Sequence, residues 1–85
     1  MYWFRIFYYE KISRRVVPVY PYGYNDETSL FRVYAETPEQ AAEMAYAIMA
    51  SDPQYHHHLD RILALSAKVD DCDYDKWRAD HYKAM

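Results

Sequence analysis

Cysteine, glycine and long apolar runs are scarce in this sequence, and each shortage excludes a class of protein. The single cysteine, Cys72, cannot form a disulfide within the chain, so we expect a reducing, cytoplasmic location. The single glycine, Gly23, excludes a glycine-rich phosphate loop. No apolar stretch reaches the roughly 18 residues of a membrane-spanning helix, so we expect no membrane partner.

Basic charge is also limited. The chain carries 10 Lys and Arg against 13 Asp and Glu, a net charge of −3. Proteins that hold nucleic acid through its phosphates are usually basic, so this balance disfavours nucleic acid as a partner. Residues 1–36 have a net charge of +1 and residues 37–85 a net charge of −4. We therefore expect a protein partner with a basic surface to meet the second half.

Aromatic side chains, in contrast, are abundant. The 85 residues are 52% hydrophobic and include eleven tyrosines. A disordered chain lacks this apolar mass, so the sequence predicts a packed structure. At about 100–200 residues per domain, we expect residues 1–85 to form one compact domain.

Two segments alternate as β-strands do, namely 2–12 and 30–36. The first segment divides its side chains between two faces, with Tyr2, Phe4, Ile6 and Tyr8 on one and Trp3, Arg5, Phe7 and Tyr9 on the other. Residues 13–24 contain prolines, which predict an edge strand or extended arm, and 21–29 are typical of a turn.

The clearest local signal is a helix start at Thr37-Pro38-Glu39-Gln40. Thr37 can cap the helix, Pro38 suits its first position, and Gln40 can complete a capping box. The helix is expected over 38–50, and its predicted buried face consists of Ala41, Met44, Ala45, Ile48 and Met49.

The rest of the chain is less clear. Residues 51–69 fit a helix and a strand equally well. Residues 74–84 predict a short helix with Asp73 as N-cap and an aromatic stripe that includes Trp77. The predicted fold is α+β, with an antiparallel sheet of three or four strands packed by the helix at 38–50, plus a C-terminal helix.

Catalytic and metal-binding patterns are weak. Adjacent histidines at 56–58 cannot converge on one tetrahedral ion, and the acidic run from Asp70 lacks the glycine and glutamate of a calcium-binding loop. Acidic neighbours should raise the pKa of Cys72 and weaken it as a nucleophile. We expect no enzyme activity, no catalytic residues, no metal and no cofactor.

The predicted second face of the sheet is the strongest functional candidate. Tyr, Trp and Arg dominate protein interfaces, and bases also stack on such a face. Alternatively, the aromatic stripe of the C-terminal helix covers it, or a homodimer forms through it. The candidate binding residues are Trp3, Arg5, Phe7, Tyr9, Arg32 and Tyr34 on this face, and Asp70, Asp71, Asp73 and Asp75 in the acidic run.

The segment from Phe31 to Ala45, in which a strand runs into the Thr37-Pro38 helix start, resembles a pattern common in small bacteriophage and mobile-element proteins. The short acidic chain also resembles phage-encoded anti-defence proteins such as anti-CRISPRs. This resemblance implies an inhibitor that acts in the host cytoplasm and occupies a site on a host complex without catalysis. Such proteins share no motif, so the resemblance assigns no residue a role. The alternative function is a single-stranded nucleic-acid-binding module that uses the aromatic and arginine face.

Overall fold

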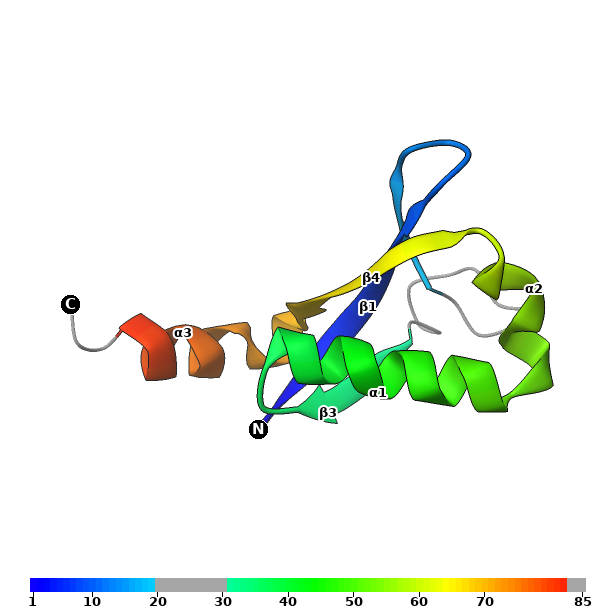
Figure 1. The fold of residues 1–85 in the computed structure, drawn as a ribbon. Helices are drawn as coiled ribbons and strands as arrows, with labels where there is room; N and C mark the ends of the chain where they lie inside the picture. The colour runs from blue at the N-terminus through cyan, green and yellow to red at the C-terminus, as the bar shows by residue number, and fades with distance from the viewer. Residues whose placement is uncertain (20–30, 83–85) are drawn as a thin grey trace.

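The computed structural model describes residues 1–19 and 31–82 of the chain. Within this part, an antiparallel sheet of four strands packs against one long helix, and a second helix follows at the C-terminal end. This is the α+β class predicted from the sequence. The turn predicted over 21–29 lies outside the described residues. Figure 1 shows the long helix lying across the layer of strands.

The first strand is the centre of the sheet, because every other strand pairs with it in antiparallel orientation. On one side, β2 and β3 follow one another along β1, and β4 runs along the other side. The strands are β1 (Tyr2–Glu10), β2 (Val16–Pro18), β3 (Arg32–Ala35) and β4 (Ile62–Val69).

Ile6 of β1 forms backbone hydrogen bonds both with the residue after β2 and with the residue before β3. Its backbone N–H donates to the carbonyl of Phe31 at 3.2 Å, and its own carbonyl accepts from the N–H of Val19 at 3.0 Å. The predicted edge segment and the second predicted strand therefore share one side of β1. The strand predicted over 2–12 ends at Glu10, where a turn begins.

The long helix, α1 (Pro38–Ser51), begins where the sequence predicts. The Thr37 hydroxyl oxygen accepts from the N–H of Gln40 at 3.1 Å. The Gln40 side-chain oxygen accepts from the N–H of Glu36 at 2.8 Å, one residue before the partner of a standard capping box. The first of these bonds satisfies a backbone donor that the first turn of a helix leaves free, and the second ties the helix to the residue before its N-cap.

The buried face of α1 is narrower than the sequence pattern predicts. Ala41, Ala45 and Met49 are fully buried, but Met44 is 39% exposed and Ile48 is 43% exposed. The two small alanines let the helix lie close to the sheet along a single row of positions four residues apart. Met44 and Ile48 project from the flank of that row, so their prediction as core residues is wrong.

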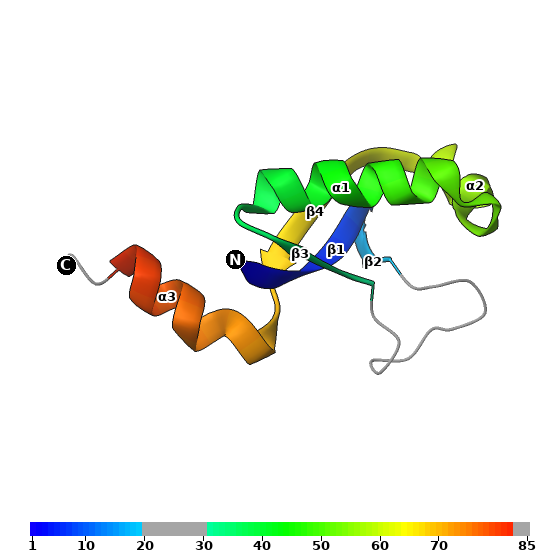
Figure 2. The same ribbon diagram turned by 90° about the horizontal axis from the view of Figure 1, so that it is seen from below.

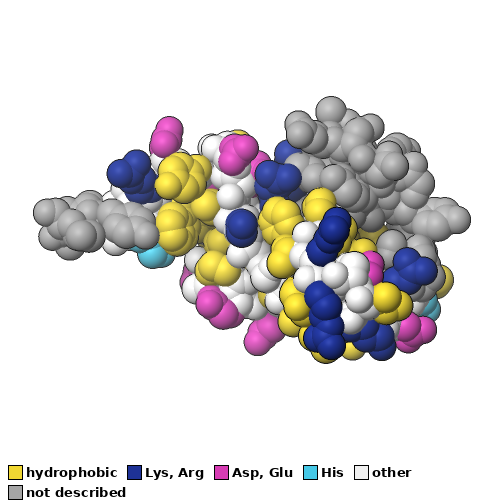
Figure 3. Space-filling model, turned by 90° about the horizontal axis from the view of Figure 1, so that it is seen from above, with side chains coloured by type: hydrophobic (Ala, Val, Ile, Leu, Met, Phe, Trp, Pro, Cys, Tyr) yellow, Lys and Arg dark blue, Asp and Glu magenta, His cyan; other side chains and the backbone are white. Residues whose placement is uncertain are grey.

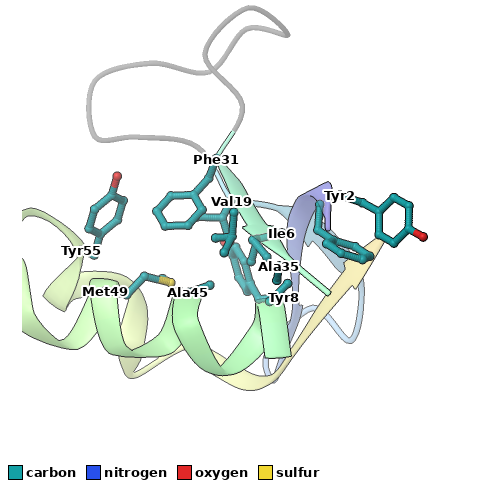
Figure 4. Close-up of a cluster of buried hydrophobic side chains, with 12 residues drawn as sticks. Tyr2, Ile6, Tyr8, Val19, Phe31, Ala35, Ala45, Met49 and Tyr55 are labelled. Atoms are coloured by element: carbon teal, nitrogen blue, oxygen red, sulfur yellow. The ribbon is translucent and has the colours of Figure 1, made fainter. Parts of the chain in front are cut away.

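The core lies between α1 and one face of the sheet (Figure 4). Phe4, Ile6 and Met49 are its largest fully buried side chains, together with Val19. The ring of Tyr55 meets the ring of Phe31 edge to face, with centroids 5.6 Å apart and planes at 84°. Tyr2, Phe4, Ile6 and Tyr8 of β1 point into this core, as predicted.

Residues 51–69 combine both predicted alternatives. A 3-10 turn, η2 (Pro53–Tyr55), and a short helix, α2 (His56–Leu59), precede β4. The strand prediction is confirmed for 62–69 and the helix prediction is wrong there. Pairing with β1 along nearly the whole of β4 decides between them, because periodicity alone does not separate the two for a short apolar run.

The C-terminal end contains a 3-10 turn, η3 (Asp71–Asp73), and the predicted helix, α3 (Tyr74–Tyr82). Asp73 is not an N-cap, because it belongs to the preceding turn and its side chain binds elsewhere. Figure 2 shows α1 over one face of the sheet and α3 running away from the end of the sheet.

Candidate functional site

The face of the sheet opposite α1 carries the predicted aromatic and arginine side chains. We call it the open face, because no helix of the described residues lies over it (Figure 2). Strand register groups its side chains, since Trp3 is opposite Tyr34 and Arg5 is opposite Arg32. The open face consists of Trp3, Arg5, Phe7 and Tyr9 of β1, Arg32 and Tyr34 of β3, Val16 and Pro18 of β2, and Ala64, Ser66 and Lys68 of β4.

Trp3 and Tyr34 form an exposed aromatic pair at one end of the open face. Their ring centroids are 5.0 Å apart and their planes are tilted by 45°. Trp3 is 43% exposed and Tyr34 is 41% exposed, although both belong to residue types that usually bury most of their surface. The contact fixes two large rings where a ligand can reach them.

The next pair along the strands is Arg5 and Arg32, whose positive charges would repel each other directly across the ladder. Asp70, which is 5% exposed, relieves this repulsion. Its Oδ1 atom lies 3.3 Å from Arg32 Nε and 4.0 Å from Arg5 Nε. The three side chains form one group that joins both margins of the sheet.

Burial acts to raise the pKa of Asp70, but hydrogen bonding from Cys72 and the charge of Arg32 outweigh it, and the net shift is downward. The same hydrogen bond to Asp70 is the largest cause of a raised pKa for the Cys72 thiol. Cys72 is therefore a weak nucleophile, as expected. The main cause is Asp70, while Asp73, one of the two sequence neighbours that the prediction invoked, raises this pKa by a smaller effect.

Phe7 lies at the middle of the open face between two cations. The Arg5 guanidinium carbon is 5.5 Å from the ring centroid, and Lys68 Nζ is 5.6 Å from it. Both distances are within the range of cation–π attraction. Positive charge is thus held close to an aromatic surface along the centre of the sheet.

The acidic run does not act as a single patch. Asp70 is buried and already paired with arginines of its own chain, so it is not available to a basic partner as predicted. Asp73 accepts a hydrogen bond from the backbone N–H of Trp3 at 2.7 Å. Asp71 and Asp75 are the exposed members of the run.

The alternative in which α3 covers the open face is wrong for Trp77. That side chain packs against the core cluster, and it lines a hollow with Phe4 and Pro38 on the α1 side of the sheet. Its ring stacks on His81 with centroids 4.4 Å apart. The Tyr2 hydroxyl also donates to Asp80, which fixes α3 to the end of β1.

Two of the histidines considered as metal ligands contact backbone atoms, and the side chains of His57 and His58 lie outside what the structure describes. His56 Nε2 lies 2.9 Å from the carbonyl of Ala50, and His81 Nδ1 lies 2.8 Å from the carbonyl of Trp77. Among the side chains that the structure describes, no three His, Cys, Asp or Glu residues come together as metal ligands. Within residues 1–19 and 31–82, no helix has both the length and the apolarity needed to cross a bilayer.

The part of the open face that β4 contributes was not predicted from the sequence. Lys68 and Ser66 lie there because β4 is a strand, and each is opposite a residue of the predicted face. The signal was present in the alternation of 62–69, but the competing helix pattern obscured it. Val16 and Pro18 were missed because the register of the predicted edge segment was unknown.

Comparison with protein-family models, with curated proteins and with solved structures found no match to this chain.

Proposed function

We propose that the chain is a non-catalytic module that binds a protein partner through the open face. The observation that carries this proposal is the exposed pair of Trp3 and Tyr34 on a sheet face that no described helix covers. Burial of such rings dominates the energy of protein interfaces, with truncation of a central anchor costing about 2 kcal/mol or more.

Preorganisation supports the same role. The contact between the two rings, the close ion pair of Asp70 with Arg32 and its longer charge contact with Arg5 hold the side chains in place before a partner arrives. Side chains that are already ordered lose less conformational entropy when they bind. The open face therefore has the properties of a docking surface in the free chain.

The partial neutralisation of the two arginines by Asp70 favours a protein partner over a nucleic-acid partner. Asp70 neutralises part of the charge of Arg5 and Arg32, which reduces the attraction for phosphate groups. The whole chain has a net charge of −3, which repels a polyanion. Since the open face itself carries positive charge, its partner should present an acidic or neutral patch there. Asp71 and Asp75 remain exposed for basic groups beside it.

The biological role that we propose is inhibition by occlusion. A small rigid domain that covers a functional site on a host complex needs only an exposed binding face. The sequence resemblance to phage anti-defence proteins suggests a host nuclease or surveillance complex as the target. The proposal assigns no catalytic residue to this chain.

The test is capture of partners by purified wild-type chain and two matched variants. Trp3→Ala removes an anchor that is 43% exposed, and Ile48→Ala removes an equally exposed side chain from α1. We expect the captured protein to be lost with Trp3→Ala, whose affinity should fall about 30-fold, and kept with Ile48→Ala. Equal capture by both variants would contradict the proposal.

A second candidate is a single-stranded nucleic-acid module, which the cations beside Phe7 favour. Trp77→Phe leaves Trp3 as the only tryptophan, so its fluorescence reports on the open face. Quenching by oligonucleotides that weakens steeply with salt would support this function. Unchanged fluorescence at low salt would exclude it.

A further inference from the structure

Three cations lie side by side in one row across the open face. Arg32 of β3 is opposite Arg5 of β1, and Lys68 of β4 is opposite Arg5 on its other side. Neighbouring strands are about 4.8 Å apart, so like charges in one row lie close together and repel each other. In the part of the chain that the structure describes, no other residue of the open face is charged.

A single carboxylate does not balance this row. Asp70 lies 3.3 Å from Arg32 Nε but 4.0 Å from Arg5 Nε, which is beyond hydrogen-bond distance. Among the described residues, Arg5 Nε has no hydrogen-bond partner. No described carboxylate pairs with Lys68, whose Nζ lies 5.6 Å from the ring centroid of Phe7. Three cations therefore share one carboxylate, and the row keeps an excess of positive charge.

This one carboxylate is also out of reach of a ligand. Asp70 is 5% exposed, whereas the side chains of Arg5 and Arg32 are 28% and 41% exposed and Lys68 is exposed as well. A ligand that approaches the row therefore meets cations and no acidic group. Hydrogen bonds between such cations and a carboxylate are about twice as strong as bonds between neutral groups.

Aromatic side chains flank the row along the direction of the strands. Along β1, the pair of Trp3 and Tyr34 lies two positions before the row, and Phe7 lies two positions after it. A segment that lies over this face can thus place an acidic side chain on the cations and apolar side chains on the rings at either side. Figure 3 shows basic and hydrophobic side chains next to one another near the middle of the molecule.

We propose that the open face binds an acidic segment of a protein partner, with its carboxylates on the row of Arg32, Arg5 and Lys68 and its apolar side chains on the flanking rings. This inference rests on the proposed function and names the chemistry of the partner. A few carboxylates supply the negative charge that the row lacks. A nucleic acid fits less well, because its many phosphates would meet a chain whose net charge is −3.

Asp70 acts as an internal competitor in this arrangement. Its carboxylate and those of the partner interact with the same arginines and repel each other. Asp70→Asn should therefore tighten the binding of an acidic segment by about threefold, although it destabilises the fold. A purely structural role of Asp70 predicts no gain in affinity.

The first test measures the fluorescence anisotropy of a labelled peptide in which two glutamates lie between leucines, against the same peptide with glutamines in their place. We expect the glutamate peptide to bind about tenfold more tightly at low salt, and this difference to shrink as salt is added. A labelled single-stranded oligonucleotide is the third probe. Equal binding of the two peptides, or tighter binding of the oligonucleotide than of the glutamate peptide, would overturn the inference.

Charge-removing variants test whether the peptide lies on the row. Arg5→Gln and Lys68→Gln should each weaken binding of the glutamate peptide about fivefold and leave the glutamine peptide unaffected. Arg78→Gln removes the same charge from an exposed position of α3 and should change the affinity less than about twofold. Equal losses with Lys68→Gln and Arg78→Gln would overturn the inference, because net charge alone would then explain the binding.

Failure of this inference is distinguishable from failure of the proposed function. If the glutamate peptide shows no preference, the acidic segment is wrong, but a captured partner that Trp3→Ala loses still supports docking on the open face. If Trp3→Ala captures the partner as well as wild type does, the open face itself is wrong as the docking surface, whatever the peptides show.

Discussion

The Arg32 guanidinium lies 3.3 Å from the buried carboxylate of Asp70, and this pair connects the two margins of the sheet across the central strand. Arg32 belongs to β3 on one side of β1, and Asp70 directly follows β4 on the other side. The same carboxylate is 4.0 Å from Arg5 of the central strand. One aspartate thus joins the strands of the open face and lies close to two of its cations.

Asp70→Asn should destabilise the fold by about 1–3 kcal/mol, because it leaves Arg5 and Arg32 facing each other without a compensating charge. This loss of stability is smaller than that expected when a fully buried ion pair is broken, because solvent screens the partly exposed arginines. Urea unfolding at neutral pH measures the loss. Asp75→Asn, at an exposed position of the same run, should change the free energy of unfolding by less than about 0.5 kcal/mol.

Acid should remove the contribution of Asp70. Its pKa is lowered in the folded chain, so the carboxylate stabilises the fold above the unfolded pKa of about 3.9 and loses this effect as pH falls below it. The difference in unfolding free energy between wild type and Asp70→Asn should therefore shrink from pH 6 to pH 2. A difference that stays constant over this range would contradict the ion-pair account.

Adjacent residues of α1 should respond very differently to truncation. Met49 is fully buried and Ile48 is 43% exposed. Met49→Ala should cost about 2–4 kcal/mol through lost apolar burial and the cavity left behind, and Ile48→Ala less than about 1 kcal/mol. Thermal or urea unfolding provides the comparison. Equal losses at the two positions would show that the core is wider than the structure indicates.

The turn between β1 and β2 contains a residue in an unfavourable conformation. Arg14 has a φ of 60°, and its N–H donates to the carbonyl of Glu10 at 2.8 Å. A side chain beyond glycine costs about 1–2 kcal/mol in this region, and the greater freedom of unfolded glycine offsets part of that. Arg14→Gly should therefore stabilise the fold by about 0.5–1 kcal/mol in urea unfolding. Arg15→Gly should not stabilise it, and the opposite ranking would contradict the assigned turn.

Tyr2 should titrate later than an ordinary tyrosine. Its hydrogen bond to Asp80, followed by burial, raises its pKa from 10.0 to about 12. The raised value means that the neutral phenol stabilises the docked α3 below pH 10 and loses this effect between pH 10 and 12. Ultraviolet titration of the phenolates should show a late tyrosine that is absent in Tyr2→Phe. In Asp80→Asn its pKa should move back toward 10.0, and an unchanged titration would refute the contact.

Local chemistry made much of the fold predictable. The capping residues around Pro38 located α1, and strict alternation assigned residues 2–9 of β1 to the correct faces. The helix-or-strand choice for 62–69 was not local, because only pairing with β1 decides it. The exposure of Met44 and Ile48 likewise depends on how closely two alanines allow the helix to approach the sheet.

The candidate site was predicted in part. Strand alternation in the sequence predicts that Trp3, Tyr34, Arg5 and Arg32 lie on the same face of the sheet. The internal role of Asp70 was not predictable, because it depends on Asp70 reaching both Arg5 and Arg32 from the far margin of the sheet. A charged residue in an acidic run is usually solvated, and only the tertiary structure shows this one buried.

The most direct test of the open face is the fluorescence of Trp3 in the Trp77→Phe variant, with and without the captured partner. In the free chain, a quencher such as iodide should reach Trp3, because the side chain is 43% exposed. Binding should shift the emission to shorter wavelength and protect Trp3 from quenching. Unchanged emission and quenching at saturating partner would contradict docking on the open face.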